Sequence, residues 1–298
     1  MAELAPNQEK LQSVKAEEVS SPWKEAWRGF KKNKSALIGA GIVIFFIFIA
    51  FFAPLLAPQG NNEQMLSDRL QSPSAEHWFG TDDFGRDIFS RVLYGARISL
   101  TVGFFAVVGS VVVGSLLGII AGYYGKWTDI IISRFFDIML AFPSILLAIA
   151  VVAVLGPSLR NALIAIAIIN VPNFGRLIRS KVLSVKQEEY IMSAKAIGMS
   201  DVRILFQHIL PNSMAPIIVQ GTLAIATAII EAAALGFLGL GAQPPAAEWG
   251  KMLADSRQYL IQAPWTMIFP GLAIMVTVLG FNLMGDGLRD ALDPRMKN

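Results

Sequence analysis

Few side chains in this sequence have the type and spacing needed for catalysis or metal binding. The chain has no cysteine, and its two histidines, His77 and His208, belong to no HExxH motif or other zinc-ligand pattern. No GxSxG segment is present. The glycine and lysine at 125 and 126 do not form a phosphate-binding loop, because Ile120 and Trp127 occupy positions that require glycine and serine or threonine. We therefore predict no catalytic residue, no metal site and no nucleotide site on this chain.

Two polar residues lie inside long apolar runs. Glu231 is the one acid in the run from Asn212 to Gly241. An ionisable group within a membrane is costly and usually faces a cavity or a partner. We expect Glu231 either to line a translocation path or to form a structural ion pair or hydrogen bond with another helix. Asn170, two residues before Pro172, either points into the same path or satisfies a backbone group that the proline leaves free.

The composition predicts an all-α protein embedded in a membrane. Of the 298 residues, 54% are hydrophobic and only 16% are charged, against about 25% charged in an average soluble protein. Membrane-spanning helices need about 20 mainly apolar residues each. Uncharged apolar runs predict six spans, at about 36–57, 98–122, 138–158, 161–179, 212–240 and 264–285. We assign residues 1–34 to a tail and an interfacial helix, and residues 35–298 to one transmembrane domain.

The distribution of lysine and arginine predicts the orientation of these spans. With the N-terminus in the cytoplasm, the inner segments carry 18 of the 25 basic residues and the outer segments carry 7. Basic residues concentrate on the cytoplasmic side of membrane proteins, so both termini are expected there. An outer loop then covers 58–97. Because orientation accounts for most of the basic residues, nucleic acid is not an expected partner.

Two local patterns indicate packing. Before the first span, Ser21 is a plausible N-cap and Pro22 a first helical residue, and the following segment reads as an amphipathic helix. Such a helix either lies in the inner membrane interface or packs on a partner. In the second span, small residues recur at every fourth position, which favours close helix packing. These small residues are Ser110, Gly114, Gly118 and Gly122.

The polar segment 186–211 separates two apolar runs on the predicted cytoplasmic side. It reads as a short helix after Glu189, a turn at Gly198, and a second short helix that Ser200 caps, before Pro211 introduces the fifth span. Two short helices that meet at small residues form a protruding knob. A partner protein is expected to grip it through a surface that comprises Ala194, Lys195, Ala196, Gly198, Met199 and Ser200.

This segment resembles the coupling loop of ABC-importer permeases, whose pattern is Glu-Ala-Ala, three residues, Gly, nine residues, Ile-x-Leu-Pro. The positions that match are Ala194, Gly198, Leu210 and Pro211, and those that depart are Met192 for the glutamate, Ser193 for the first alanine and His208 for the isoleucine. Four further segments narrow the resemblance to the second permease subunit of dipeptide and oligopeptide importers. They are Phe79–Leu100, Phe136–Ala148, Glu231–Leu253 and Phe281–Arg295.

The resemblance implies a type I importer permease fold in a bacterial cytoplasmic membrane. It also implies a related permease partner, two ATPase subunits that bind ATP and Mg²⁺, and an extracytoplasmic peptide-binding protein. Closure of the ATPases would move the coupling helices and switch the access of the cavity. A permease for nickel or another small solute shares these motifs, and a self-sufficient secondary transporter is a more distant alternative, since it should carry several intramembrane acids.

The outer loop contains a tight polar cluster that has two open interpretations. Asp82, Asp83, Arg86 and Asp87 lie within six residues, next to turn-forming glycines. They form either an outer cap that contacts the binding protein or a self-contained turn network held by Arg86. Trp249, in the following outer segment, is expected at an interface or docking contact.

Overall fold

The structure, a computed structural model, describes residues 22–292, and this part is built from helices with one isolated β-bridge between Thr81 and Asp87. The predicted tail up to Ser21 lies outside the described residues. The main helices are α2 (Pro22–Lys32), α3 (Lys34–Leu56), α4 (Ile88–Tyr124), α5 (Lys126–Leu140), α6 (Ser144–Leu155), α7 (Leu159–Val185), α8 (Glu189–Ala196), α9 (Asp201–Ile204), α10 (Leu210–Phe237), α11 (Trp249–Ser256) and α12 (Trp265–Leu292). The prediction of an all-α chain is confirmed for these residues.

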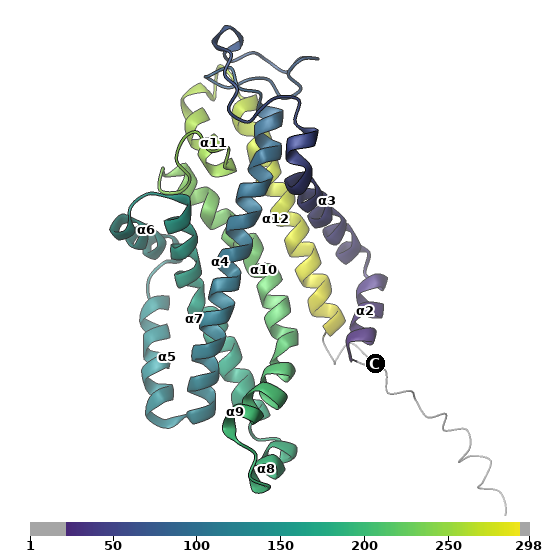
Figure 1. The fold of residues 1–298 in the computed structure, drawn as a ribbon, viewed down its shortest axis with the longest axis vertical. Helices are drawn as coiled ribbons and strands as arrows, with labels where there is room; N and C mark the ends of the chain where they lie inside the picture. The colour runs from purple at the N-terminus through teal and green to yellow at the C-terminus, as the bar shows by residue number, and fades with distance from the viewer. Residues whose placement is uncertain (1–21, 293–298) are drawn as a thin grey trace, which may run out of the picture.

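The long helices form an elongated bundle with two distinct ends (Figure 1). One end carries the segment between α3 and α4 together with α11, and the other end carries α8 and α9. Within residues 22–292, five helical segments are long and apolar enough to cross a membrane, or six if a bent helix pair counts as one span. The first of them, α3, begins after Asn33, whose side chain accepts a hydrogen bond from the amide of Ala36 at 3.2 Å.

Close contact between α4 and α7 depends on the small residues of α4. A Cβ atom added at Gly114 would lie 2.6 Å from the carbonyl oxygen of Val171, and one at Gly118 would collide with the carbonyl oxygen of Gly175. The hydroxyl of Ser110 donates to the carbonyl oxygen of Ala167 at 2.9 Å. The backbones therefore approach at distances that only small side chains permit, and the packing prediction for this stripe is confirmed.

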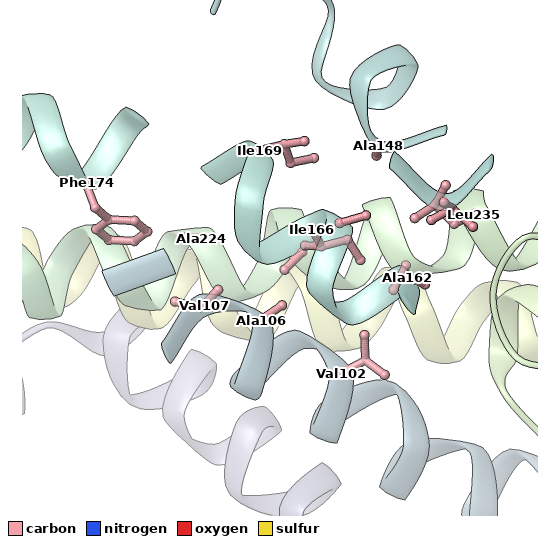
Figure 2. Packing of buried hydrophobic residues seen from close by; sticks show 14 residues of the cluster. Val102, Ala106, Val107, Ala148, Ala162, Ile166, Ile169, Phe174, Ala224 and Leu235 are labelled. Carbon is pink, nitrogen blue, oxygen red and sulfur yellow. The ribbon is translucent and has the colours of Figure 1, made fainter. Parts of the chain in front are cut away.

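A buried apolar core joins α4, α6, α7 and α10. Val102 and Ala106 of α4, Ala148 of α6 and Ile166 of α7 are fully buried in it, and Leu235 of α10 completes one side. Figure 2 shows these side chains converging from the four helices. The core fixes the relative positions of the elements that carry the polar pair described below.

The predicted third span, 138–158, is two helices in the structure. α5 ends at Leu140, α6 begins at Ser144, and the two are bent by 95°. Pro143 explains the break, because proline disfavours helical backbone at the preceding residue and lacks the amide that a continuing helix needs. The segment between Gly125 and Gly156 is therefore an L-shaped unit. Its first arm, α5, begins twelve residues before the predicted start of the span at residue 138.

Two other boundaries differ markedly from the prediction. α4 begins at Ile88, ten residues before the predicted span and inside the predicted outer loop, where Asp87 caps it. The expected second short helix after Gly198 is the beginning of one long helical segment, Asp201–Phe237. That segment passes through Pro211 with a local π-helix over Leu205–Ile209. The wider turns of the π-helix lie directly before the proline, which cannot donate a backbone hydrogen bond.

The amphipathic segment before the first span forms α2, with Pro22 at its start as predicted. Phe30 is buried, Trp27 is exposed, and their rings stack at 6.0 Å. The backbone of α2 also approaches the end of α12, where Gly29 lies against Ala291. The location of α2 in the membrane interface stays a prediction.

Candidate coupling surface and translocation residues

The knob at the α8–α9 end is shaped by a helix stop at Gly198. The amides of Gly198 and Met199 donate to the carbonyl oxygens of Lys195 and Ala194, each at 3.0 Å, which closes the end of α8. Gly198 has φ of +81°, a conformation that glycine adopts without steric cost. A Cβ atom there would meet nothing within 4 Å. The backbone conformation, rather than crowding inside this chain, is what requires glycine.

The knob is anchored to the bundle by a buried apolar cluster and by polar contacts to Tyr123. Ile191, Ala194 and Ile204 are buried in one cluster with Ile178 of α7. The Tyr123 hydroxyl, at the end of α4, donates to the Asp201 carboxylate, and the Lys195 ammonium lies 4.7 Å from the centre of the Tyr123 ring. These contacts hold the knob at a fixed angle to α4 and α7.

One detail of the predicted knob differs from the structure, and one contact was not predicted. Ser200 occupies the N-cap position of α9, but its side chain makes no capping hydrogen bond. Asp201 stabilises the junction through Tyr123, in addition to lying in the first turn where an acid suits the helix dipole.

The exposed surface of the knob includes large apolar side chains among its polar ones. Met192, Ile197 and Val202 are all exposed, and the side chain of Ile197 is 80% accessible. Ala196 and Gly198 lie between them and are also exposed. A group of exposed large apolar side chains on a firmly anchored projection is typical of a protein contact surface. Met192 occupies the position of the glutamate in the family pattern, and its exposed side chain adds apolar surface there.

The two polar residues of the predicted path lie together inside the bundle. The Asn170 amide donates to the Glu231 carboxylate and to the carbonyl oxygen of Ile166, both at 3.0 Å. Both side chains are buried. The hydrogen bond joins α7 to α10 across 61 residues of sequence. The Ile166 carbonyl lies six residues before Pro172, whereas the carbonyl that the proline leaves free is four residues before it, at Ile168. Asn170 therefore pairs with the acid and with its own helical turn, and the path role of both residues stays a prediction.

The outer polar cluster is an internal network. Arg86 donates from Nε to the Asp82 carboxylate at 2.7 Å, and Asp82 also accepts from the amides of Phe84 and Arg86 at 2.9 and 3.0 Å. Asp82 and Arg86 are buried, as is Asp87. These observations match the self-contained turn network. Asp83 is the more accessible member, and partial burial together with the neighbouring Asp82 raises its pKa.

Asp87 has a structural role at the start of α4. Its carboxylate accepts from the amide of Ser90 at 2.7 Å and lies 3.1 Å from Nδ1 of His77, which is also buried. A helix N-cap and a buried imidazole partner leave this side chain no free face for a binding protein. We therefore correct the expectation of a docking contact for Asp82, Arg86 and Asp87, which are enclosed by their own loop.

Trp249 is also an internal residue, which corrects the expectation of a docking contact. Its side chain is fully buried, and its indole Nε1 donates to the carbonyl oxygen of Val92 at 3.0 Å. The ring packs edge-on against Phe46, with centroids 5.8 Å apart. Trp249 therefore joins α11 to α3 and α4, where a large aromatic side chain with one donor stabilises a buried junction.

Glu248, which sequence reasoning did not single out, fixes α11 in the same region. Its carboxylate accepts from the amides of Gly250 and Lys251 at 2.8 Å, which caps α11. Ser99 of α4 lies within 3.5 Å. Burial raises the pKa of the Glu248 carboxyl, and these hydrogen bonds oppose the rise. An acid directly before a short helix is the signal that would have identified it.

Ion pairs between α5 and α7 were also not anticipated. Arg179 donates two hydrogen bonds to the Asp129 carboxylate, and the one from Nη2 is 2.7 Å long. Nη2 of Arg176 lies 2.6 Å from Oδ1 of Asp137. They connect the L-shaped unit to α7 on the knob side of the bend. Across residues 22–292, no three metal-ligating side chains gather at one point.

Two family models match this chain. Residues 114–298 match the binding-protein-dependent transport system inner membrane component, and residues 21–73 match the N-terminal transmembrane domain of oligopeptide transport permease C.

Characterised proteins with similar sequences carry transport names. The chain is 69% identical over 278 residues to the dipeptide transport system permease protein of Alkalihalophilus pseudofirmus, covering 93% of this chain and 91% of that protein. It is 49% identical over 289 residues to the glutathione transport system permease protein of Pectobacterium atrosepticum, covering 97% and 96%.

A solved structure shares the fold. A chain of the methionine ABC transporter MetNI, in an inward-facing conformation, aligns with a TM-score of 0.56 at 17% identity, over 68% of this chain and 96% of that one. With the helical architecture, these matches show that the chain is a membrane-embedded permease that belongs to the family of binding-protein-dependent transport system inner membrane components, and that it is a transport subunit rather than an enzyme.

Proposed function

We propose that this chain is one of two related permease subunits of an ATP-driven importer of short peptides. The observation that carries the proposal is the anchored knob with large apolar side chains on its exposed surface, since a permease without its own nucleotide site needs a surface through which an ATPase can act on it. Ile197 and Val202 provide the most accessible apolar part of that surface.

In this proposal, ATP and Mg²⁺ bind two partner ATPase subunits on the cytoplasmic side. Their closure pushes on α8 and the start of α9. Because buried contacts connect the knob to α4 and α7, the push is transmitted to the helices that carry Asn170 and Glu231. Both termini then lie in the cytoplasm, and an extracytoplasmic peptide-binding protein delivers the substrate to the end that carries α11.

Short peptides are the substrates that the relatives support best. The names of the two similar proteins refer to a dipeptide and to glutathione, itself a short peptide. The Glu231–Asn170 pair offers a negative or polar contact for a peptide amino group inside the bundle. The same pair gives no comparable reason to favour a metal ion, for which two neighbouring ligands are few.

Purification in mild detergent from the native cells tests the assembly. We expect the chain to copurify with a second permease, two ATPases and a peptide-loaded binding protein. An Ile197→Asp variant should lose the ATPases, because a charge would be buried in an apolar contact. Ile261→Asp is the matched control, since Ile261 is also highly exposed and lies in the segment after α11, away from the knob. Recovery of the ATPases with both variants would contradict the proposed contact surface.

A further inference from the structure

An arginine without a partner among residues 22–292 lies on α4. The side chain of Arg97 is exposed and makes no hydrogen bond or ion pair within that part of the chain. It lies nine residues after Ile88, the first residue of α4, at the boundary of the predicted apolar span. A charged group at the edge of a membrane helix needs water, a counter-charge or a lipid headgroup.

Arg97 lies at one end of an apolar groove. The groove has a volume of about 730 Å³ and is formed by α3, α4, α10 and α12. Its walls include Ile47, Phe51, Phe104 and Phe281, and Arg97 is its one charged lining residue. No acid lines the groove, so the arginine leaves a net positive charge at its rim.

The groove has the length of one membrane leaflet. On α3 it extends from Val43 to Phe51, and on α4 from Arg97 to Phe105. Each interval covers eight helical steps, or about 12 Å at 1.5 Å per residue. One leaflet contributes about half of the roughly 30 Å hydrocarbon core. The groove therefore begins at the α11 end of the molecule and stops near the middle of the membrane.

We propose that this groove binds one phospholipid of the outer leaflet, with an acyl chain along α3 and α4 and the phosphate on the Arg97 guanidinium. The assignment of the groove to the outer leaflet rests on the proposed function. A guanidinium forms paired hydrogen bonds with phosphate oxygens, and the apolar walls match a hydrocarbon chain. Lipids with a net negative headgroup bind better than zwitterionic lipids. The lining contains no acid, so nothing repels an anionic headgroup and nothing attracts the ammonium group of a zwitterionic one.

A helix of the partner permease is the competing occupant. An apolar helix would fill the walls equally well, but it would cover the Arg97 charge, and it would need an acid at that level to compensate. A phospholipid supplies the counter-charge at the rim and the apolar part below it in one molecule. The bound lipid would then seal α3 against α4 while the remaining helices move.

Native mass spectrometry of the purified importer complex tests this proposal, with phosphatidylglycerol and phosphatidylcholine as probes. We expect the wild-type complex to retain phosphatidylglycerol preferentially, and Arg97→Gln to weaken that retention by about tenfold, as loss of a charge-assisted hydrogen bond predicts. Arg160→Gln is the matched control, because Arg160 is an exposed arginine at the start of α7 and belongs to a predicted outer segment, like Arg97. A second variant, Ala50→Phe, fills the groove and leaves Arg97 intact, and it should also reduce retention.

Two results would overturn the proposal. One is equal lipid retention by the wild type and by both groove variants. The other is efficient cross-linking of a Phe104→Cys variant to the partner permease, which would show that a helix covers the groove; the natural chain has no cysteine that could interfere. Peptide uptake by the same complex is measured in parallel. Absence of ATP-driven peptide uptake with normal lipid retention would refute the proposed function and leave the lipid site standing.

Discussion

Replacing Glu231 by glutamine separates a role in transport from a role in folding. Glutamine keeps the size of the side chain and an oxygen that accepts the hydrogen bond from Asn170, whose amide lies 3.0 Å away. Hydrogen bonds between membrane helices contribute about 0.6 kcal/mol on average and at most about 1.7. Since about 1.4 kcal/mol corresponds to a tenfold change in an equilibrium, even complete loss of this bond changes the folded population of a stable protein little.

We therefore expect Glu231→Gln to assemble normally and to reduce ATP-driven peptide uptake by tenfold or more, because the negative charge in the path is lost. Asn170→Ala, which removes the donor and keeps the acid, should lower the melting temperature of the complex slightly and affect uptake less. The assays are size-exclusion chromatography with the partner subunits, thermal unfolding in detergent, and uptake into proteoliposomes.

A control on the same helix tests whether any buried polar change has this effect. Thr222→Val removes a hydroxyl that bonds only to the backbone of α10, at the carbonyl oxygen of Ile218, and it should leave uptake unchanged. Uptake at the wild-type rate by Glu231→Gln would refute the path role. Failure of Glu231→Gln to assemble would show that the acid serves folding, contrary to the magnitude given above.

Three further changes test the packing, the knob and the outer cap. Gly118→Ala should destabilise the complex by about 1–3 kcal/mol, since its Cβ collides with α7, whereas Gly221→Ala, which meets open space on α10, should be neutral or stabilising in the same melting experiment. Gly198→Ala should cost about 1–2 kcal/mol at its left-handed backbone, seen as faster hydrogen exchange over residues 189–200; unchanged exchange would contradict the proposed helix stop. Burial raises the pKa of Glu248 above the unfolded value, so the folded chain holds its proton longer, and stability should fall as pH rises from about 4.5 through the raised pKa. Glu248→Gln should show a smaller fall over that window in thermal unfolding, and parallel pH curves for both proteins would contradict this assignment.

The sequence was a good guide to the helices and a poorer guide to where they break. Long apolar runs predicted both ends of α3 and α10, and the starts of α7 and α12, to within three residues, whereas α7 and α12 continue six and seven residues past their predicted ends. The same criterion hid the bend between α5 and α6, where Phe142–Pro143 carried the signal but no charge interrupted the run. In a similar way, Pro211 suggested a helix boundary, yet a π-helix accommodates it.

The polar residues were recognised individually, but their pairing was not. Glu231 and Asn170 were notable because each is polar within an apolar run, but their hydrogen bond depends on the α4–α7–α10 packing. For the outer cap the residue types were misleading in another way. Asp82, Arg86 and Trp249 have the side chains of a docking surface, yet the loop and α11 enclose them, and no local pattern reveals this burial.

Uptake by the reconstituted complex tests the central claim most directly. The chain is placed in proteoliposomes with its partner permease and ATPases, together with the binding protein and a labelled dipeptide. The account predicts accumulation of the peptide that requires both ATP hydrolysis and the binding protein, and that Ile197→Asp abolishes. Accumulation by this chain alone, without ATP, would contradict the account and indicate a secondary transporter.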